Sequence, residues 1–183
     1  MRVRENIQIA LECTAFLWVV YFVGLFLHLN LQSHGIRPRS VPGLQGLVFA
    51  PFLHAGINHL FSNSLALAPL LAVSFMYSRQ LTWKVIAITS IVGGAFVWML
   101  GSANAVHIGS SGVIFGLIGY LLAIGLVRKE LPALLVSLIV LSYYGWALFS
   151  LFVVLPGVSW SGHFFGFASG ILAAWMTKRD RAR

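Results

Sequence analysis

Residues 109–128 read GSSGVIFGLIGYLLAIGLVR, a stretch that carries no charged side chain before Arg128. A run of about 20 apolar residues is long enough to cross the hydrocarbon core of a bilayer as a helix. Within it Gly112, Gly116 and Gly119 recur at spacings of four and three residues and so share one helix face. Because small residues let two helices approach closely in lipid, the stretch predicts a membrane-spanning helix packed tightly against a neighbour.

The composition of the whole chain is that of a membrane protein. Of the 183 residues, 59% are apolar and 9% are charged, whereas soluble domains carry about 25% charged residues. A single cysteine excludes a disulfide scaffold. The net charge of +8 comes from cations dispersed between apolar runs, which excludes a nucleic-acid-binding surface. No acid lies at the centre of an apolar run, which argues against carboxylate proton relays, aspartic proteolysis and an HExxH zinc site.

Six apolar segments predict six transmembrane helices, and we expect residues 1–183 to form a single all-α membrane domain. Their approximate bounds are 9–29, 57–77, 83–100, 110–127, 131–155 and 158–177. With the N-terminus in the cytoplasm, ten Lys and Arg residues fall on the inner side and only Arg37 and Arg39 on the outer side. The positive-inside rule therefore predicts a multi-pass protein with both termini cytoplasmic, as in a bacterial inner (plasma) membrane.

The connection at residues 30–56 differs from the other loops, which are short. It is rich in proline and glycine, yet its second half, LVFAPFLHAGI at residues 47–57, is apolar. We expect this loop to lie in the outer interface or to dip into the bilayer against the protein. A plain extracytoplasmic loop with some buried apolar residues is the alternative.

Three groups of polar side chains interrupt the apolar segments. They are His59 and Asn63 in HAGINHLFSN (54–63), Ser111 in GSSG (109–112) and His163 in SGHFFGFASG (161–170). The second, fourth and sixth segments all run from outside to inside, so we expect the three groups to meet at one depth below the outer surface. Gly166 and Gly170 share a helix face with His163, so its imidazole should point toward a closely packed neighbour. If that neighbour is segment 110–127, Ser111 and His163 come within hydrogen-bonding reach.

These residues predict a Ser–His dyad, because a histidine that takes the serine proton makes the hydroxyl a strong nucleophile. The backbone N–H of Ser111 and the side chains of His59 and Asn63 are candidate donors to an oxyanion. Each element alone has another explanation. Gly and Ser are common at helix contacts, a transmembrane His often packs or binds a cofactor, and a His/Asn pair can join helices. Their combination at one depth favours a hydrolase.

The chain resembles the rhomboid family of intramembrane serine proteases from about residue 46 to 177. The motifs HxxxN at 59–63, GxSG at 109–112 and GHxxG at 162–166 carry the resemblance. It implies that Ser111 is the nucleophile and His163 the general base, with the oxyanion bound by His59, Asn63 and the Ser111 amide. It also implies residues that shape the site, namely Gly109, Gly112, Gly162, Gly166 and Phe115.

The resemblance further implies cleavage of transmembrane segments of other membrane proteins near their outer end, without metal or cofactor. The implied partners are transmembrane protein substrates and the lipid bilayer. Two positions depart from the family pattern. Gln45 and Gly46 stand where many rhomboids carry a Trp-Arg pair, which puts the usual anchoring of the first loop in doubt, and Phe115 stands where Tyr is frequent.

Two alternatives stay open. One is a catalytically silent rhomboid relative that binds membrane clients, against which the presence of both dyad residues argues. The other is a haem or metal protein that uses His54, His59, His107 and His163 as ligands, which leaves the GxSG motif unexplained.

Other positions carry smaller expectations. We expect His54 to be a structural loop residue that hydrogen-bonds backbone near the site. Asn104, His107 and Ser110 are expected to lie in a solvated loop, with contact to substrate as the alternative. Because substrate must enter sideways, helix 131–155 and loop 156–161 are expected to form a movable wall.

Overall fold

The computed structural model describes residues 2–153 and 158–180, and all regular secondary structure in these ranges is helical. The elements are α1 (Arg2–Phe26), η1 (Leu31–His34), η2 (Val41–Gln45), α2 (Gly46–Phe49), η3 (Ala50–Phe52), α3 (Ile57–Tyr77), α4 (Arg79–Ile88), η4 (Thr89–Gly93), α5 (Gly94–Leu100), α6 (Ser111–Arg128), α7 (Leu131–Tyr144), η5 (Gly145–Leu151) and α8 (Trp160–Met176). An isolated antiparallel bridge joins Ile36 to His107.

Five helices of the described ranges are long and apolar enough to cross a membrane. They are Arg2–Phe26, Ile57–Tyr77, Arg79–Leu100, Ser111–Arg128 and Leu131–Leu151. The sixth predicted segment forms α8, whose 17 residues make it shorter than these five. The fold is therefore that of an all-α, multi-pass integral membrane protein.

Several segment boundaries differ from the expected ones. The first helix ends at Phe26 instead of near residue 29, and the third begins at Arg79 instead of near residue 83. Two further differences have a structural cause. Helix α1 begins at Arg2 instead of near residue 9 because its polar first turns are held by Arg79, which pairs with Glu5 at 2.9 Å and donates to Asn6. The fifth segment leaves α-helical geometry after Tyr144 and continues as the 3-10 helix η5 to Leu151. Its expected end at residue 155 lies outside the described residues.

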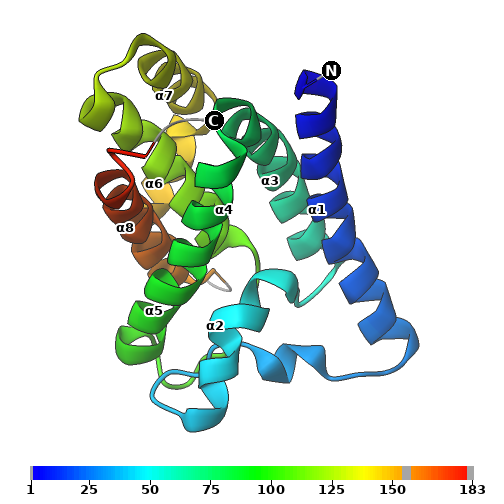
Figure 1. Cartoon of the computed structure of the whole chain (residues 1–183). Coiled ribbons are helices and arrows are strands. Elements are labelled where there is room, and N and C mark those ends of the chain that lie inside the picture. The colour runs from blue at the N-terminus through cyan, green and yellow to red at the C-terminus, as the bar shows by residue number, and fades with distance from the viewer. Residues whose placement is uncertain (1, 154–157, 181–183) are drawn as a thin grey trace.

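Helix α6 is the centre of the bundle (Figure 1), and it packs against α3, α4, α7 and α8. Leu117, Ile118, Tyr120 and Leu121 of α6 are completely buried. Many large apolar side chains on the other helices are exposed, as expected for surfaces that face lipid rather than water. The buried core is thus centred on α6, and the helices around it present apolar side chains to the outside.

The close approach expected from the two glycine stripes is present between α6 and α8. A methyl group at Gly166 would overlap the carbonyl oxygen of Gly112, and one at Gly170 would overlap that of Gly116. Both obstacles are backbone atoms, which cannot rotate away. The two helices therefore touch along a seam that only glycine permits, and we call it the α6–α8 seam.

The third span is interrupted by the π turn η4, which lies against this pair of helices. Thr89 at the start of the turn occupies the space where a side chain at Gly116 would lie, and a methyl group at Gly93 would come 2.9 Å from Ser169 Oγ. A π turn widens the helix locally and re-aims its side chains. Here it lets the third span fit against both α6 and α8.

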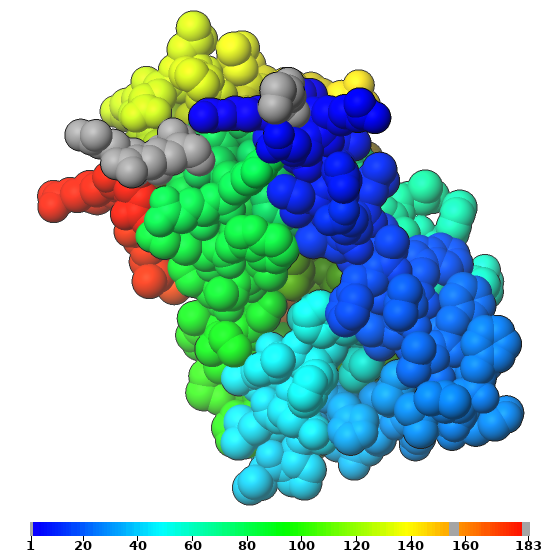
Figure 2. Space-filling model, turned by 45° about the vertical axis from the view of Figure 1, so that its right-hand side comes forward, coloured from blue at the N-terminus to red at the C-terminus, as the bar shows by residue number. Residues whose placement is uncertain are grey.

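The first loop forms a lobe at the end of the molecule opposite the start of α1, coloured light blue to cyan in Figures 1 and 2. Arg39 anchors it: its backbone N–H donates to Trp98 O at 2.9 Å, and its guanidinium donates to Met99 O and Gly101 O, each at 3.0 Å. Trp98 Nε1 in turn donates to Ser40 O at 2.8 Å. This loop is therefore tied to the end of α5 without the Trp-Arg pair of many rhomboids.

Gly46 stands at the second position that departs from the family pattern, and the path of the first loop explains why it is glycine. A methyl group there would overlap the backbone of Gly35 and Ile36, because the loop crosses itself at this point. The neighbouring Gln45 contacts His34, with 3.1 Å between Oε1 and Nδ1. An arginine at residue 46 would not fit this path of the loop.

The other end of the bundle carries polar contacts between helix ends. Lys84 pairs with Asp180 at 2.6 Å. Arg128 donates to the carbonyl oxygens of Thr177 and Asp180 at 2.8 and 2.5 Å. These contacts bring together α4 and the C-terminal ends of α6 and α8. The N-terminal ends of α6 and α8 therefore lie at the other end of the bundle, beside the lobe.

Candidate active site

A cavity of about 940 Å³ lies at the lobe end of the bundle, between α3, α6 and α8. Its lining includes the four residues singled out from the sequence as catalytic or oxyanion-binding, namely His59, Asn63, Ser111 and His163. They come from three helices that are separate in the sequence. The structure therefore brings all four residues to one cavity.

Ser111 is the first residue of α6, and the chain reaches it through a strained turn. Gly109 has a φ of +110°, a conformation that residues with a Cβ rarely adopt. Its N–H donates to Ala50 O at 2.9 Å. A methyl group at Gly109 would lie 2.7 Å from two ring atoms of His59 and 3.2 Å from Asn63 Nδ2. Glycine at this position thus lets the turn that bears Ser111 approach His59 and Asn63.

His163 lies in the first turn of α8, and its ring is held on two sides. The imidazole stacks on Phe115 of α6 with 4.2 Å between ring centroids and 18° between the planes. Its Nδ1 lies 3.1 Å from Ser150 Oγ of η5. The side chain is 9% exposed. The expected packing of Phe115 against this imidazole is therefore present.

Across the described residues, no hydrogen bond joins Ser111 to His163. The side chain of Ser111 is only partly buried, and both residues face the same cavity. In enzymes without bound substrate, catalytic hydrogen bonds are often long and shorten when substrate binds. The described structure thus places both side chains at one cavity but does not join them by a hydrogen bond.

His54 contacts the other side of the site and orients Asn63. Its Nε2 lies 3.1 Å from Asn63 Nδ2, and its ring meets that of His59 edge-on at 5.1 Å. Burial, with the nearby His59, lowers the pKa of His54 to about 4, so the ring is neutral at pH 7. A neutral Nε2 accepts one amide hydrogen of Asn63 and leaves the second for another acceptor. The ring thus contacts a side chain of the site in addition to the nearby backbone of Phe52, a backbone contact that the sequence predicts.

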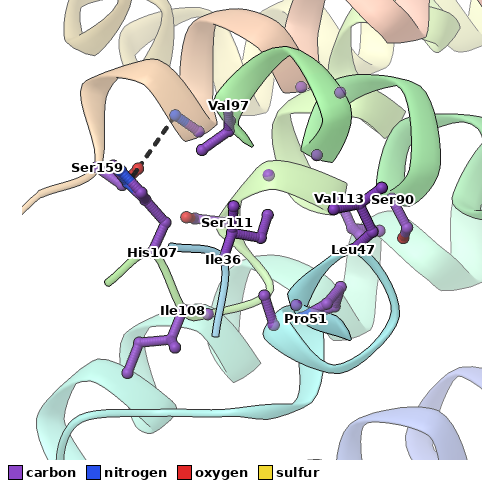
Figure 3. Close-up of a pocket in the computed structure, with 18 of the residues that line it drawn as sticks. Ile36, Leu47, Pro51, Ser90, Val97, His107, Ile108, Ser111, Val113 and Ser159 are labelled. Carbon is purple, nitrogen blue, oxygen red and sulfur yellow. Dashed lines mark hydrogen bonds between the residues drawn. The ribbon is translucent and has the colours of Figure 1, made fainter. Parts of the chain in front are cut away.

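His107 connects the loop before Ser111 to the start of α8. It exchanges backbone hydrogen bonds with Ile36, and its Nδ1 lies 2.7 Å from Ser159 Oγ, which accepts from Gly162 N at 3.1 Å. Burial lowers the pKa of His107. Figure 3 shows His107 and Ser159 on one side of Ser111, around a small cavity of about 50 Å³.

The expectation of a solvated loop before Ser111 is therefore wrong for two of its three residues. His107 and Ser110 are buried, at 9% and 2% exposure, whereas Asn104 is exposed. The loop is covered because residue 36 pairs with it and α8 begins beside it. Nothing in the local sequence marks either long-range contact.

The histidines of the metal-binding alternative do not gather as ligands. Among residues 2–153 and 158–180, no group of three or more His, Cys, Asp or Glu side chains is placed to hold a metal ion. Instead, His54, His107 and His163 each meet a different polar side chain. This arrangement gives no support to a haem or metal centre.

Comparison with known proteins agrees with the resemblance noted in the sequence. Residues 42–180 match the Rhomboid domain family. The chain is 30% identical over 140 residues to a Bacillus subtilis protein provisionally named a rhomboid protease. The aligned residues cover 75% of this chain and 69% of the relative. It is 35% identical over 178 residues to an uncharacterized Mycobacterium tuberculosis protein, covering 91% of this chain and 72% of the relative. An uncharacterized Mycobacterium leprae protein is 35% identical over 174 residues, covering 88% and 67%. The chain therefore belongs to the rhomboid family.

Proposed function

We propose that the protein is an intramembrane serine endopeptidase that cleaves transmembrane segments of other membrane proteins near their outer end. The observation that carries the proposal is the single cavity lined by Ser111, His163, His59 and Asn63. Family membership and the membrane-spanning helices give independent support.

In the proposed reaction, the Ser111 hydroxyl attacks the scissile carbonyl carbon and His163 takes its proton. The carbonyl oxygen becomes an oxyanion, which accepts hydrogen bonds from the Ser111 N–H, the free amide hydrogen of Asn63 and the His59 ring. His163 then gives the proton to the leaving amine, and a water molecule hydrolyses the acyl-enzyme by the reverse sequence. Each oxyanion donor is typically worth about 10²–10³ in rate.

The topology proposed for this activity has six spans and both termini in the cytoplasm of a bacterium. Helix α8 is the sixth span, and the site then lies below the outer surface of the inner membrane. The excess of cations on the inner side, ten of the 12 Lys and Arg residues, supports this orientation. The partners are transmembrane protein substrates in the same bilayer.

The test is cleavage of a tagged single-span substrate by purified protein in liposomes. We expect the parent protein to cleave, and Ser111→Ala and His163→Ala to lose at least 10³-fold in rate. Ser110→Ala is the matched control. The neighbouring Ser110 hydroxyl is buried and has no hydrogen-bond partner among the described residues, so its removal should leave activity unchanged. Equal cleavage by the parent and Ser111→Ala would reject the proposal.

The second candidate function is a silent relative that holds membrane clients. The observation in its favour is that no hydrogen bond joins Ser111 to His163 in the part of the chain that the structure describes, although both line one cavity. It predicts capture of transmembrane clients with no cleavage and no covalent labelling of Ser111 by a fluorophosphonate. Specific labelling of Ser111 would reject it, because only an activated hydroxyl reacts readily.

A further inference from the structure

Ser150 is the one residue of η5 whose side chain is hydrogen-bonded to His163 among the described residues. Its Oγ lies 3.1 Å from His163 Nδ1 and 2.8 Å from the carbonyl oxygen of Ala147, three residues earlier. The same 3-10 turn is fastened to α8 a second time, where Trp160 Nε1 donates to Leu151 O at 2.7 Å. The position of Ser150 is therefore fixed relative to His163.

The two contacts of Ser150 decide which ring nitrogen of His163 carries the proton. A serine hydroxyl has one hydrogen, and the carbonyl of Ala147 can only accept a hydrogen bond. Both contacts are hydrogen bonds only if Ser150 donates to Ala147 and accepts from His163. The accepted hydrogen must then be on Nδ1, which leaves Nε2 with its lone pair. A general base needs such a lone pair, so this is the tautomer that catalysis requires.

We propose that Ser150 is a positioning residue, which holds His163 in the Nδ1–H tautomer and fixes its ring plane together with Phe115. The proposal rests on the function proposed above, because it gives Ser150 its role through the general base. No acid lies at the centre of an apolar run, and Glu12, within the first run, is exposed and accepts a hydrogen bond from Gln8. Ser150 supplies a neutral acceptor at the place where serine proteases with a triad use a carboxylate.

The location of Ser150 adds a consequence for substrate entry. It belongs to the segment expected to form the movable wall, and its neighbours Trp146, Phe149 and Phe152 are 76%, 76% and 85% exposed. When η5 moves away from α8, the hydrogen bond to His163 breaks and the ring is free to change tautomer. Orientation of the base is thereby coupled to the position of the wall.

The experiment compares Ser150→Ala and Ser150→Thr with the parent in the liposome cleavage assay. We expect Ser150→Ala to lower kcat about three- to tenfold with KM unchanged, as for loss of one hydrogen bond, and Ser150→Thr to keep at least half of the parent kcat. Ser142→Ala is the matched control. Its hydroxyl also bonds a backbone oxygen of its own segment, at 2.9 Å from Leu138 O, but it does not contact His163. Ser142→Ala should match the parent.

A second readout does not depend on activity. Protein labelled with 15N-histidine, with His163 assigned from the His163→Ala spectrum, should show a protonated Nδ1 and an unprotonated Nε2 in the parent and in Ser150→Thr. Ser150→Ala should populate the other tautomer. An unchanged tautomer in Ser150→Ala, or an Nε2–H tautomer in the parent, would overturn this proposal alone. Failure of the parent to cleave would count against the protease function, and the spectra would still decide the role of Ser150.

Discussion

The α6–α8 seam and the segment α7–η5 lie on two sides of the same site and are held in opposite ways. Eleven of the 18 residues of α6 are buried, against three of the 21 residues of Leu131–Leu151. The seam supplies Ser111 and His163, whereas the exposed segment supplies Ser150, which touches the ring of His163. In the function proposed above, the buried seam holds the reacting groups, and the exposed segment is the part that opens for substrate.

The largest expected effect comes from breaking the seam. Gly170→Ala places a methyl group against the backbone oxygen of Gly116, and such overpacking costs about 3 kcal/mol of unfolding free energy or more. Gly145→Ala in η5 is the control, since its methyl group would meet only Leu141 Cδ1 at 3.5 Å, an ordinary contact. The free energy of unfolding of both variants is measured by reversible unfolding in mixed micelles. Equal stability of the two variants would show that the seam is not tight.

The next largest effect concerns the turn at Gly109, which precedes Ser111 and places it at the cavity. Gly109→Ala forces a Cβ into a backbone conformation with a φ of +110° and against the His59 ring. We expect cleavage to fall about 10²-fold, as for a misplaced oxyanion site. Gly56→Ala, on the other side of the site and with open space around its Cβ, should keep parent activity. Parent-like cleavage by Gly109→Ala would contradict the geometry of this turn.

The buried side of the site should also respond to acid. The pKa of His54 is lowered to about 4 in the folded protein, below its ordinary value of about 6.5. The contribution of neutral His54 to the free energy of unfolding is therefore fully present above pH 6.5 and is lost as the pH falls from 6.5 toward 4. We expect the melting temperature of the parent to fall across this window and that of His54→Asn to fall less. His34→Asn, at an exposed position, is the control, and an equal decline in all three proteins would contradict the assignment.

The smallest effect tests whether the wall moves. Tyr144 Oη donates to Ala66 O at 2.9 Å and so holds the end of α7 to α3. If this contact opens for substrate entry, Tyr144→Phe should raise the cleavage rate about two- to fivefold, the range of one net hydrogen bond. Tyr143→Phe is the matched control, because Tyr143 is 73% exposed. A lower rate for Tyr144→Phe would mean that the closed wall is the active one.

The sequence predicts those parts of the molecule that depend on local pattern. The second span was expected at 57–77, and α3 runs from Ile57 to Tyr77, since polar residues end its apolar run on both sides. The glycine spacing likewise predicts a closely packed face on α6 and another on α8, because a helix face is a local property, and the structure pairs these two faces. The four residues gathered around the cavity follow from the order of the spans.

The contacts that the sequence does not predict are made between distant segments. Ser150 reaches His163 only because the fifth span changes to a 3-10 helix after Tyr144, which no apolar periodicity marks. His54 reaches Asn63, and Arg39 reaches the end of α5, through the path of the first loop. Such paths are fixed by backbone hydrogen bonds that many residue types can make.

The most direct test of the central claim is whether Ser111 is an activated nucleophile, and it needs no knowledge of the natural substrate. Protein in liposomes is treated with a fluorophosphonate and the adduct is located by peptide mapping. The account predicts an adduct on Ser111 in the parent, none at this position in Ser111→Ala, and at least tenfold slower labelling in His163→Ala. A folded parent protein that is not labelled at Ser111, or that is labelled equally fast without His163, would contradict it.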